Sequence, residues 1–112
     1  MELIVEHYPA ATMIRVNATR IDAPIALHFK EEMRTLTGKK EGRFILDLQK
    51  VTFIDSSGLG AVVASMKQLC PGQTLELAAM QPIVDKVFRL TRMDTIFAIH
   101  ANADQAVACE KT

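Results

Sequence analysis

The stretch RFILDLQKVTFIDSSGLG, residues 43–60, joins a short apolar run to a polar cluster and a second apolar segment. The run Arg43–Leu48 is too brief for a globular helix, so it predicts a central β-strand. The cluster at residues 55–58 is rich in helix-capping side chains. Apolar residues then recur at steps of three and four: Leu59, Val62, Val63, Met66 and Leu69. This spacing predicts an amphipathic helix that ends before Pro71, and the whole stretch indicates a strand–loop–helix unit.

A hairpin and a helix are expected before this unit. Residues Glu2–Tyr8 and Thr12–Ala18 contain alternating or clustered apolar positions and are separated by a short break, which predicts antiparallel pairing. Asp22 followed by Pro24 marks a helix start with Asp22 as the N-cap, and Gly38 is a suitable stop. The apolar face of this helix comprises Ile25, Phe29, Met33 and Leu36.

The C-terminal third continues the alternation of strands and helices. Leu75 and Leu77 predict a strand, and Pro82 opens a third helix. Residues Ile96–Ile99 predict a further strand, after which Asn102 caps a short final helix. The chain is therefore predicted to form a single α/β domain over residues 1–112, with a mixed, mainly parallel sheet of about five strands, an N-terminal hairpin and about four helices.

Composition excludes several classes of protein. The 112 residues carry 13 Lys or Arg and 13 Asp or Glu, a formal net charge of 0, whereas nucleic-acid binders and polybasic membrane modules need a positive excess. The longest apolar run, residues 58–66, is far shorter than the ~20 residues of a membrane span. Without a secretory signal, a cytoplasmic location is expected. Cys70 and Cys109 are expected to be buried free thiols.

Templates for catalysis are missing from the sequence. There is no Gly-x-Ser-x-Gly elbow and no glycine-rich phosphate loop. His7, His28 and His100 lie far apart without metal-ligand spacing, and we interpret them as surface or rim histidines. We expect neither enzyme activity nor a bound metal or cofactor.

The cluster Asp55-Ser56-Ser57-Gly58 admits two interpretations. In the structural one, Asp55 or a serine caps the helix, while Gly58 and Gly60 permit close packing. In the functional one, a serine hydroxyl at the helix N-terminus is exposed and can be phosphorylated. The helix dipole and free N–H groups would stabilise the added charge there.

Residues 51–60 resemble the signature of bacterial anti-sigma factor antagonists, which are STAS domains. Ile21-Asp22 before a helix resembles the Gly-x-Leu-Asp turn of that family, and residues 87–91 resemble its third-helix pattern. The element order agrees as well, so the resemblance covers nearly the whole chain.

The resemblance implies a partner-switching regulator of transcription. The unphosphorylated antagonist binds an anti-sigma factor that is also a serine kinase of the histidine-kinase-like ATPase type, which frees the sigma factor. Phosphorylation of the antagonist ends the complex, and a serine phosphatase resets it. By position the phosphorylated residue is Ser56, with Ser57 the second choice. The implied partner-binding positions are Asp22, Asp55, Ser56, Ser57, Gly58, Leu59 and Gly60.

Two positions depart from the family pattern. Thr19-Arg20 replaces the usual Gly and Glu, which suggests a differently charged partner. Arg92-Met93 stands where the family often has Gly after the third helix, so the left-handed turn there is in question. Two other functions stay open: a non-phosphorylated STAS subunit of a larger assembly, such as a lipid-transport complex, and a small-molecule or nucleotide sensor. The presence of Asp55 with both serines favours the phosphorylated switch.

Overall fold

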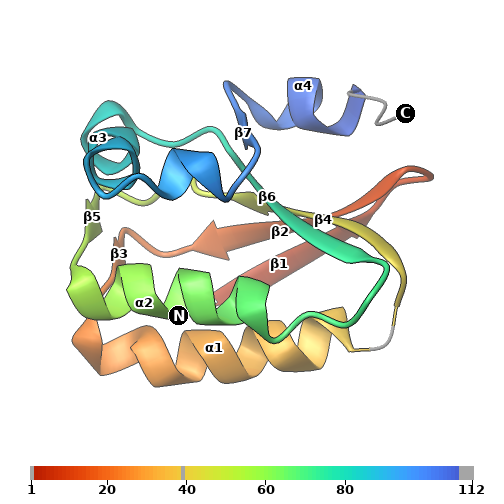
Figure 1. Ribbon diagram of the computed structural model, residues 1–112, viewed down its shortest axis with the longest axis horizontal. Helices are drawn as coiled ribbons and strands as arrows, with labels where there is room; N and C mark the ends of the chain where they lie inside the picture. The colour runs from red at the N-terminus through yellow and green to blue at the C-terminus, as the bar shows by residue number, and fades with distance from the viewer. Residues whose placement is uncertain (1, 39, 109–112) are drawn as a thin grey trace.

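The structure is a computed structural model that describes residues 2–38 and 40–108 (Figure 1). Its elements are, in chain order, β1 (Glu2–His7), β2 (Ala11–Asn17), β3 (Arg20–Ile21), α1 (Ala23–Thr37), β4 (Gly42–Asp47), β5 (Phe53–Ile54), α2 (Ser56–Lys67), β6 (Gln73–Ala78), α3 (Pro82–Leu90), the 3-10 turn η1 (Met93–Thr95), β7 (Ile99–His100) and α4 (Ala103–Ala108). No helix in this described part is long and apolar enough to cross a membrane.

The main sheet has the strand order β1-β2-β4-β6-β7. Strands β1 and β2 pair antiparallel as a hairpin, whereas the β2–β4, β4–β6 and β6–β7 pairs are parallel. The predicted mixed, mainly parallel α/β sheet with an N-terminal hairpin is confirmed. Residues 1 and 109–112 lie outside the described residues, so the bounds 1–112 stay a prediction.

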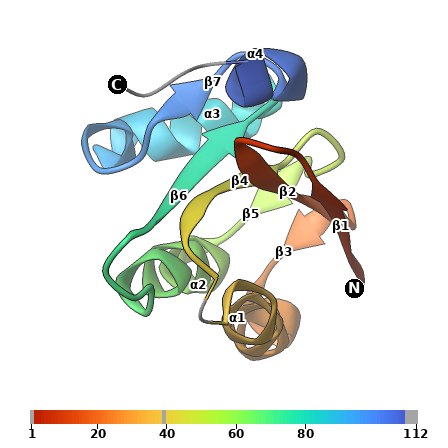
Figure 2. The same ribbon diagram turned by 90° about the vertical axis from the view of Figure 1, so that its right-hand side faces the viewer.

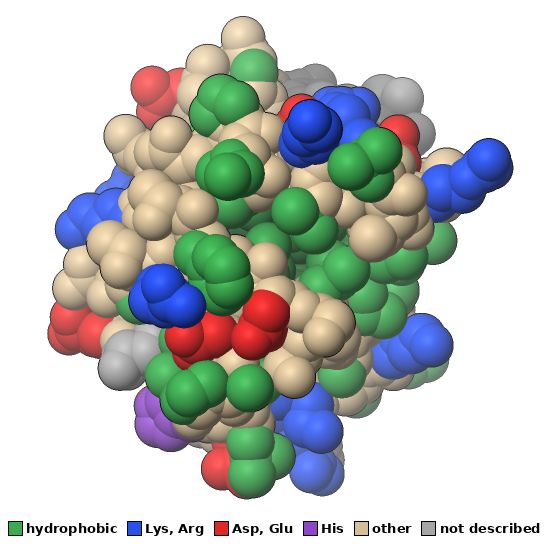
Figure 3. Space-filling view, turned by 90° about the vertical axis from the view of Figure 1, so that its left-hand side faces the viewer, with side chains coloured by type: hydrophobic (Ala, Val, Ile, Leu, Met, Phe, Trp, Pro, Cys, Tyr) green, Lys and Arg blue, Asp and Glu red, His purple; other side chains and the backbone are tan. Residues whose placement is uncertain are grey.

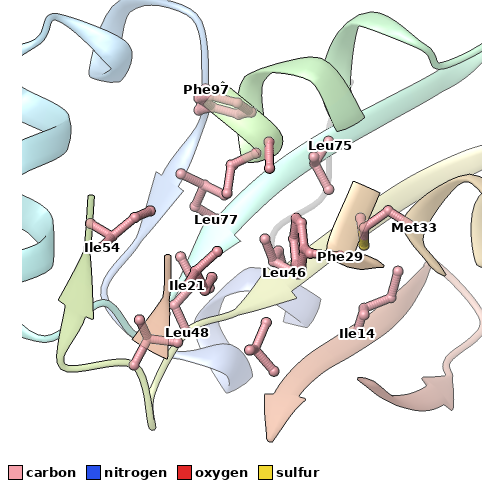
Figure 4. Packing of buried hydrophobic residues seen from close by; sticks show 14 of the residues in the cluster. Ile14, Ile21, Phe29, Met33, Leu46, Leu48, Ile54, Leu75, Leu77 and Phe97 are labelled. Atoms are coloured by element: carbon pink, nitrogen blue, oxygen red, sulfur yellow. The ribbon is translucent and has the colours of Figure 1, made fainter. Parts of the chain in front are cut away.

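The core follows from the alternation of side chains along the central strands. Ile14 and Leu46 face the main hydrophobic cluster, which also takes in residues of α1, α2 and α3 (Figure 4). The neighbouring residues Met13 and Ile45 face the opposite side of the sheet, where α4 contributes Ala106 to a smaller cluster. Helices α1 and α2 lie side by side beneath the sheet, and α4 lies across its other face (Figure 2). Both faces of the central strands are therefore buried.

The last strand is shorter than the sequence predicted. A strand was expected at Ile96–Ile99, but β7 comprises only Ile99–His100. The carbonyl oxygen of Met93 accepts hydrogen bonds from the N–H groups of Ile96 and Phe97, both at 3.1 Å, so these residues continue a turn. Phe97 is buried edge-on against Phe88, with ring centroids 6.3 Å apart. Packing of this ring fixes the turn in place of an extended strand.

Two local predictions near the helix ends have different outcomes. Asn102 caps α4 as predicted, because its Oδ1 accepts from the N–H of Gln105 at 2.8 Å. The prediction of a buried thiol is wrong for Cys70, which is exposed just after α2. Cys109 lies outside the described residues.

Candidate functional site

A small parallel ladder that the sequence did not predict positions the candidate site. Strands β3 and β5 pair through Arg20 with Phe53 and Ile21 with Ile54. Ile21 and Ile54 are buried, so the ladder is anchored in the main core. The next residue of one strand is Asp22 and that of the other is Asp55. The ladder therefore sets the starts of α1 and α2 beside each other at one end of the molecule (Figure 1).

Asp55 caps both helices. Its Oδ1 accepts from the N–H of Gly58 in α2 at 2.8 Å, and its Oδ2 accepts from the N–H of Ala23 in α1 at 3.0 Å. The hydrogen bond from Gly58 lowers the pKa of Asp55 below its ordinary value of 3.8; partial burial opposes this effect, and the hydrogen bond from Ala23 adds to it. One carboxylate thus fixes the relative position of two helix N-termini.

Asp22 is the N-cap residue of α1, as predicted, but its side chain makes no capping hydrogen bond, so the prediction of an Asx side-chain cap is wrong. Its Oδ2 instead accepts a hydrogen bond from the Nε of Arg20 at 2.9 Å. Pro24 has no N–H to donate, and the N–H of Ile25 bonds the backbone carbonyl of Asp22 at 3.1 Å, while the N–H of Ala23 is taken by Asp55. The structure brings Asp22 and Asp55 together, as the two acidic positions of the site. Their carboxylates accept hydrogen bonds from different groups: Asp22 from a side chain and Asp55 from two backbone N–H groups.

Gly58 is required by a close approach between α2 and β3. A Cβ atom at this position would lie 1.9 Å from the carbonyl oxygen of Ile21, far inside van der Waals contact. Gly60, by contrast, has nothing within 4 Å of such an atom and is exposed. The expectation of close packing is confirmed for Gly58 and wrong for Gly60.

Ser56 and Ser57 are exposed in the first turn of α2. Neither hydroxyl has a hydrogen-bond partner within the part of the chain that the structure describes. Asp55, rather than a serine, performs the capping, so both hydroxyls are left open to solvent. Leu59 is half-buried against the main core.

A shallow groove of about 230 Å³ lies between α1 and α2 and includes the exposed Ser57. It is lined mainly by small side chains: Ala26, Leu27, Lys30, Ser57, Gly60, Ala61 and Ala64. Leu27 is 63% exposed and lies off the apolar stripe that predicted α1. The sequence did not single it out, because a lone exposed leucine carries no periodic signal.

Arg20 and Phe53 form the other edge of the site and were also missed as a pair. The guanidinium Cζ lies 4.2 Å from the centroid of the Phe53 ring, a cation–π contact. Phe53 is 41% exposed. Only the register of β3 with β5 makes these residues neighbours, because they are far apart in the sequence. Figure 3 shows this end of the molecule, where apolar side chains gather beside acidic and basic ones.

This end of the molecule presents two exposed serine hydroxyls beside the Asp55 carboxylate. Among the described residues, no group of three His, Cys, Asp or Glu side chains is arranged to hold a metal ion. A cavity of about 520 Å³ is lined by residues such as Arg15, Asp47 and Asp104, none of which belongs to the first turn of α2. The exposed serines therefore lie on an open surface, outside that cavity.

Comparison with known proteins gives consistent matches. The STAS domain family pattern matches residues 2–106. The Bordetella bronchiseptica protein named "Putative anti-sigma factor antagonist BtrV" is 31% identical over 93 residues, which cover 82% of this chain and 80% of that protein.

Solved structures show the same fold. An anti-sigma factor antagonist from Mycobacterium paratuberculosis superposes with a TM-score of 0.84 and 22% identity, covering 95% of this chain and 90% of that chain. The anti-sigma factor antagonist SpoIIAA in its unphosphorylated form gives a TM-score of 0.73 and 22% identity, over 95% of this chain and 93% of its own. The phosphorylated form of the Bacillus cell fate determinant SpoIIAA gives a TM-score of 0.67 and 21% identity, covering 95% of this chain and 96% of its own.

Proposed function

Because the chain belongs to the STAS domain family, among the anti-sigma factor antagonists, we propose that it is a partner-switching regulator. In its unphosphorylated form it binds an anti-sigma factor that is also a serine kinase. Phosphorylation at Ser56, or else at Ser57, ends that complex. The observation that carries this proposal is the exposure of both hydroxyls beside a carboxylate that already performs the capping.

The energetics of the first turn favour a phosphorylation that changes the docking surface and leaves the fold intact. A phosphate adds about −1.5 to −2 charges, and a helix N-terminus is a favourable place for them. The fold therefore tolerates the modification. The docking surface changes strongly, because the new charge stands next to Asp55 and close to Asp22. SpoIIAA, a structural neighbour, is known in an unphosphorylated and a phosphorylated form.

The proposed partners supply the catalysis. A kinase of the histidine-kinase-like ATPase type brings ATP and metal, and a serine phosphatase restores the hydroxyl. The chain itself then acts in the cytoplasm without enzyme activity or cofactor. Its partner-binding positions comprise Asp22, Asp55, Ser56, Ser57, Gly58, Leu59 and Gly60. Gly58 and Asp55 act by shaping the surface, since each is engaged within the fold.

The direct test is a phosphorylation assay with a serine kinase of this type from the same organism. The wild-type chain is incubated with kinase and ATP, and the phosphorylated residue is located by mass spectrometry. We expect one phosphate in the first turn of α2, lost in Ser56→Ala and retained in the matched control Ser57→Ala. The reverse pattern would move the site to Ser57. Phosphate on neither serine would overturn the switch in favour of a non-phosphorylated STAS subunit of a larger assembly.

A further inference from the structure

Arg20 stands at the edge of the candidate site in a fixed orientation. Its Nε donates to Oδ2 of Asp22 at 2.9 Å, and its guanidinium stacks on the Phe53 ring. The side chain is nevertheless 57% exposed. Two contacts thus order a long side chain that would otherwise lose rotamer entropy on binding a partner.

The ion pair with Asp22 uses only part of the guanidinium. Within residues 2–38 and 40–108, neither terminal nitrogen of Arg20 has a hydrogen-bond partner. Those nitrogens carry four N–H donors, and the fork they form matches a carboxylate bidentately. An exposed ion pair between residues two positions apart adds little to stability. The arrangement is therefore better suited to presenting donors than to stabilising the fold.

Exposed apolar side chains lie on Arg20's stacking partner and on neighbouring elements. Phe53 is 41% exposed and Leu27 is 63% exposed. Strand β5 also packs beside α3, on which Ile83 and Leu90 are 63% and 73% exposed. Figure 3 shows apolar side chains clustered on this end of the molecule. A partner that covers such a surface is a protein that presents an acidic side chain among apolar ones.

We infer that Arg20, stacked on Phe53, is the specificity-determining residue of the docking surface and receives a carboxylate of the partner kinase. This inference rests on the proposed function and names the chemistry of its partner. It also explains why phosphorylation would weaken the complex and not strengthen it. The partner carboxylate that the guanidinium attracts is repelled by a phosphate on Ser56, at the start of the adjacent helix.

The test measures binding of unphosphorylated protein to the kinase identified by phosphosite mapping. Arg20→Glu is compared with Arg34→Glu, which changes net charge equally but lies in the last turn of α1. We expect about tenfold weaker binding for Arg20→Glu, mainly through slower association, and a change within about twofold for Arg34→Glu. The wild-type association rate falls as salt rises from about 50 to 300 mM, and Arg20→Glu loses most of that dependence.

A charge-swap experiment tests directly whether Arg20 pairs with a carboxylate of the kinase. Asp→Arg or Glu→Arg variants across the acidic residues of the kinase surface are paired with Arg20→Glu, and one of them restores binding. Thermal melts confirm that both antagonist variants are folded. If Arg20→Glu binds as the wild type does while Ser56→Asp still releases the kinase, this inference is overturned and the switch stands. If the wild-type chain binds no kinase at all, the proposed function falls and takes the inference with it.

Discussion

Asp55 joins two helices because a carboxylate has two oxygens, and each accepts from a different N–H group. An asparagine at this position has one acceptor oxygen, and its amide nitrogen can only donate. It can cap α2 through Gly58 or satisfy the N–H of Ala23, but not both. The sequence indicated a cap at residue 55 and could not show that it also serves α1, since the second bond depends on the register of β3 with β5.

The lowered pKa of Asp55 makes its contribution dependent on pH. The unfolded chain takes up a proton near the ordinary value of 3.8, whereas the folded chain does so only at lower pH. The stabilisation is therefore complete above 3.8 and is lost as pH falls through the folded-state value. We expect Asp55→Asn to lower Tm at pH 7, with a difference from wild type that shrinks by about pH 3.

Thermal melts at neutral and acid pH check this prediction. Asp22→Asn is the matched control, because its carboxylate caps neither helix. It should lower Tm at pH 7 by less than Asp55→Asn does. An equal Tm difference for Asp55→Asn at both pH values would show that the ionised carboxylate is not what holds the helix ends.

Gly58 and Gly60 are two positions apart on α2. Replacing each with alanine adds the same methyl group, and we expect opposite effects on stability. Gly58→Ala forces a Cβ atom against the Ile21 carbonyl, and overpacking of this kind costs about 1–3 kcal/mol. Gly60→Ala places the methyl in open space on an exposed helix position and gains about 0.5–1 kcal/mol in helix propensity. Urea unfolding of the two variants measures both. A similar change in both would contradict the geometry.

At the scale of elements, the long amphipathic helices and apolar strands were predictable and the two-residue ladder was not. The apolar spacing of α1 and α2 and the continuous run of β4 carry strong periodic signals. Strands β3 and β5 are too short to carry any, since two residues cannot show alternation. The ladder nevertheless decides which acidic residue caps which helix, so the site's residue types could be predicted and their hydrogen bonds could not.

The turn after α3 shows the same limit in a different form. The sequence raised the question of whether Arg92 could replace the glycine of a left-handed turn. It does so: Arg92 has φ of 61° and ψ of 24°, between the C-cap Thr91 and η1. Two backbone hydrogen bonds hold the turn. The N–H of Arg92 donates to the Arg89 carbonyl at 3.1 Å, and the N–H of Thr95 donates to the Arg92 carbonyl at 3.2 Å. The chain keeps the turn and carries the conformational cost.

Relieving that cost predicts a stabilising substitution. A left-handed conformation costs a non-glycine residue about 1–2 kcal/mol, and glycine gives back about 0.5–1 kcal/mol through its freer unfolded state. Arg92→Gly should therefore stabilise the protein by roughly 0.5–1 kcal/mol, measured by urea unfolding. Arg92→Ala removes the same exposed side chain without relieving the backbone and should give no gain. Equal stabilisation by both variants would assign the effect to the side chain.

For the whole molecule, net charge links the switch to the docking surface. The chain has a formal charge of 0, so a phosphate changes it to about −2. The core stays remote from this change, because Ser56 and Ser57 are exposed and the capping group of α2 is Asp55. Folding and binding are thus expected to respond separately to the same modification.

Ser56→Asp tests that separation, because it adds one negative charge to the N-terminus of α2 without a kinase. A carboxylate there interacts favourably with the helix dipole, by about 0.3–1 kcal/mol, so Tm should be unchanged or slightly raised. Kinase binding should weaken at least about tenfold, because the charge meets the partner's docking surface. Ser56→Ala should keep wild-type binding and resist phosphorylation. If Ser56→Asp lost binding together with a large fall in Tm, release would come from unfolding of α2, whereas a stable fold with weakened binding is what a surface switch requires.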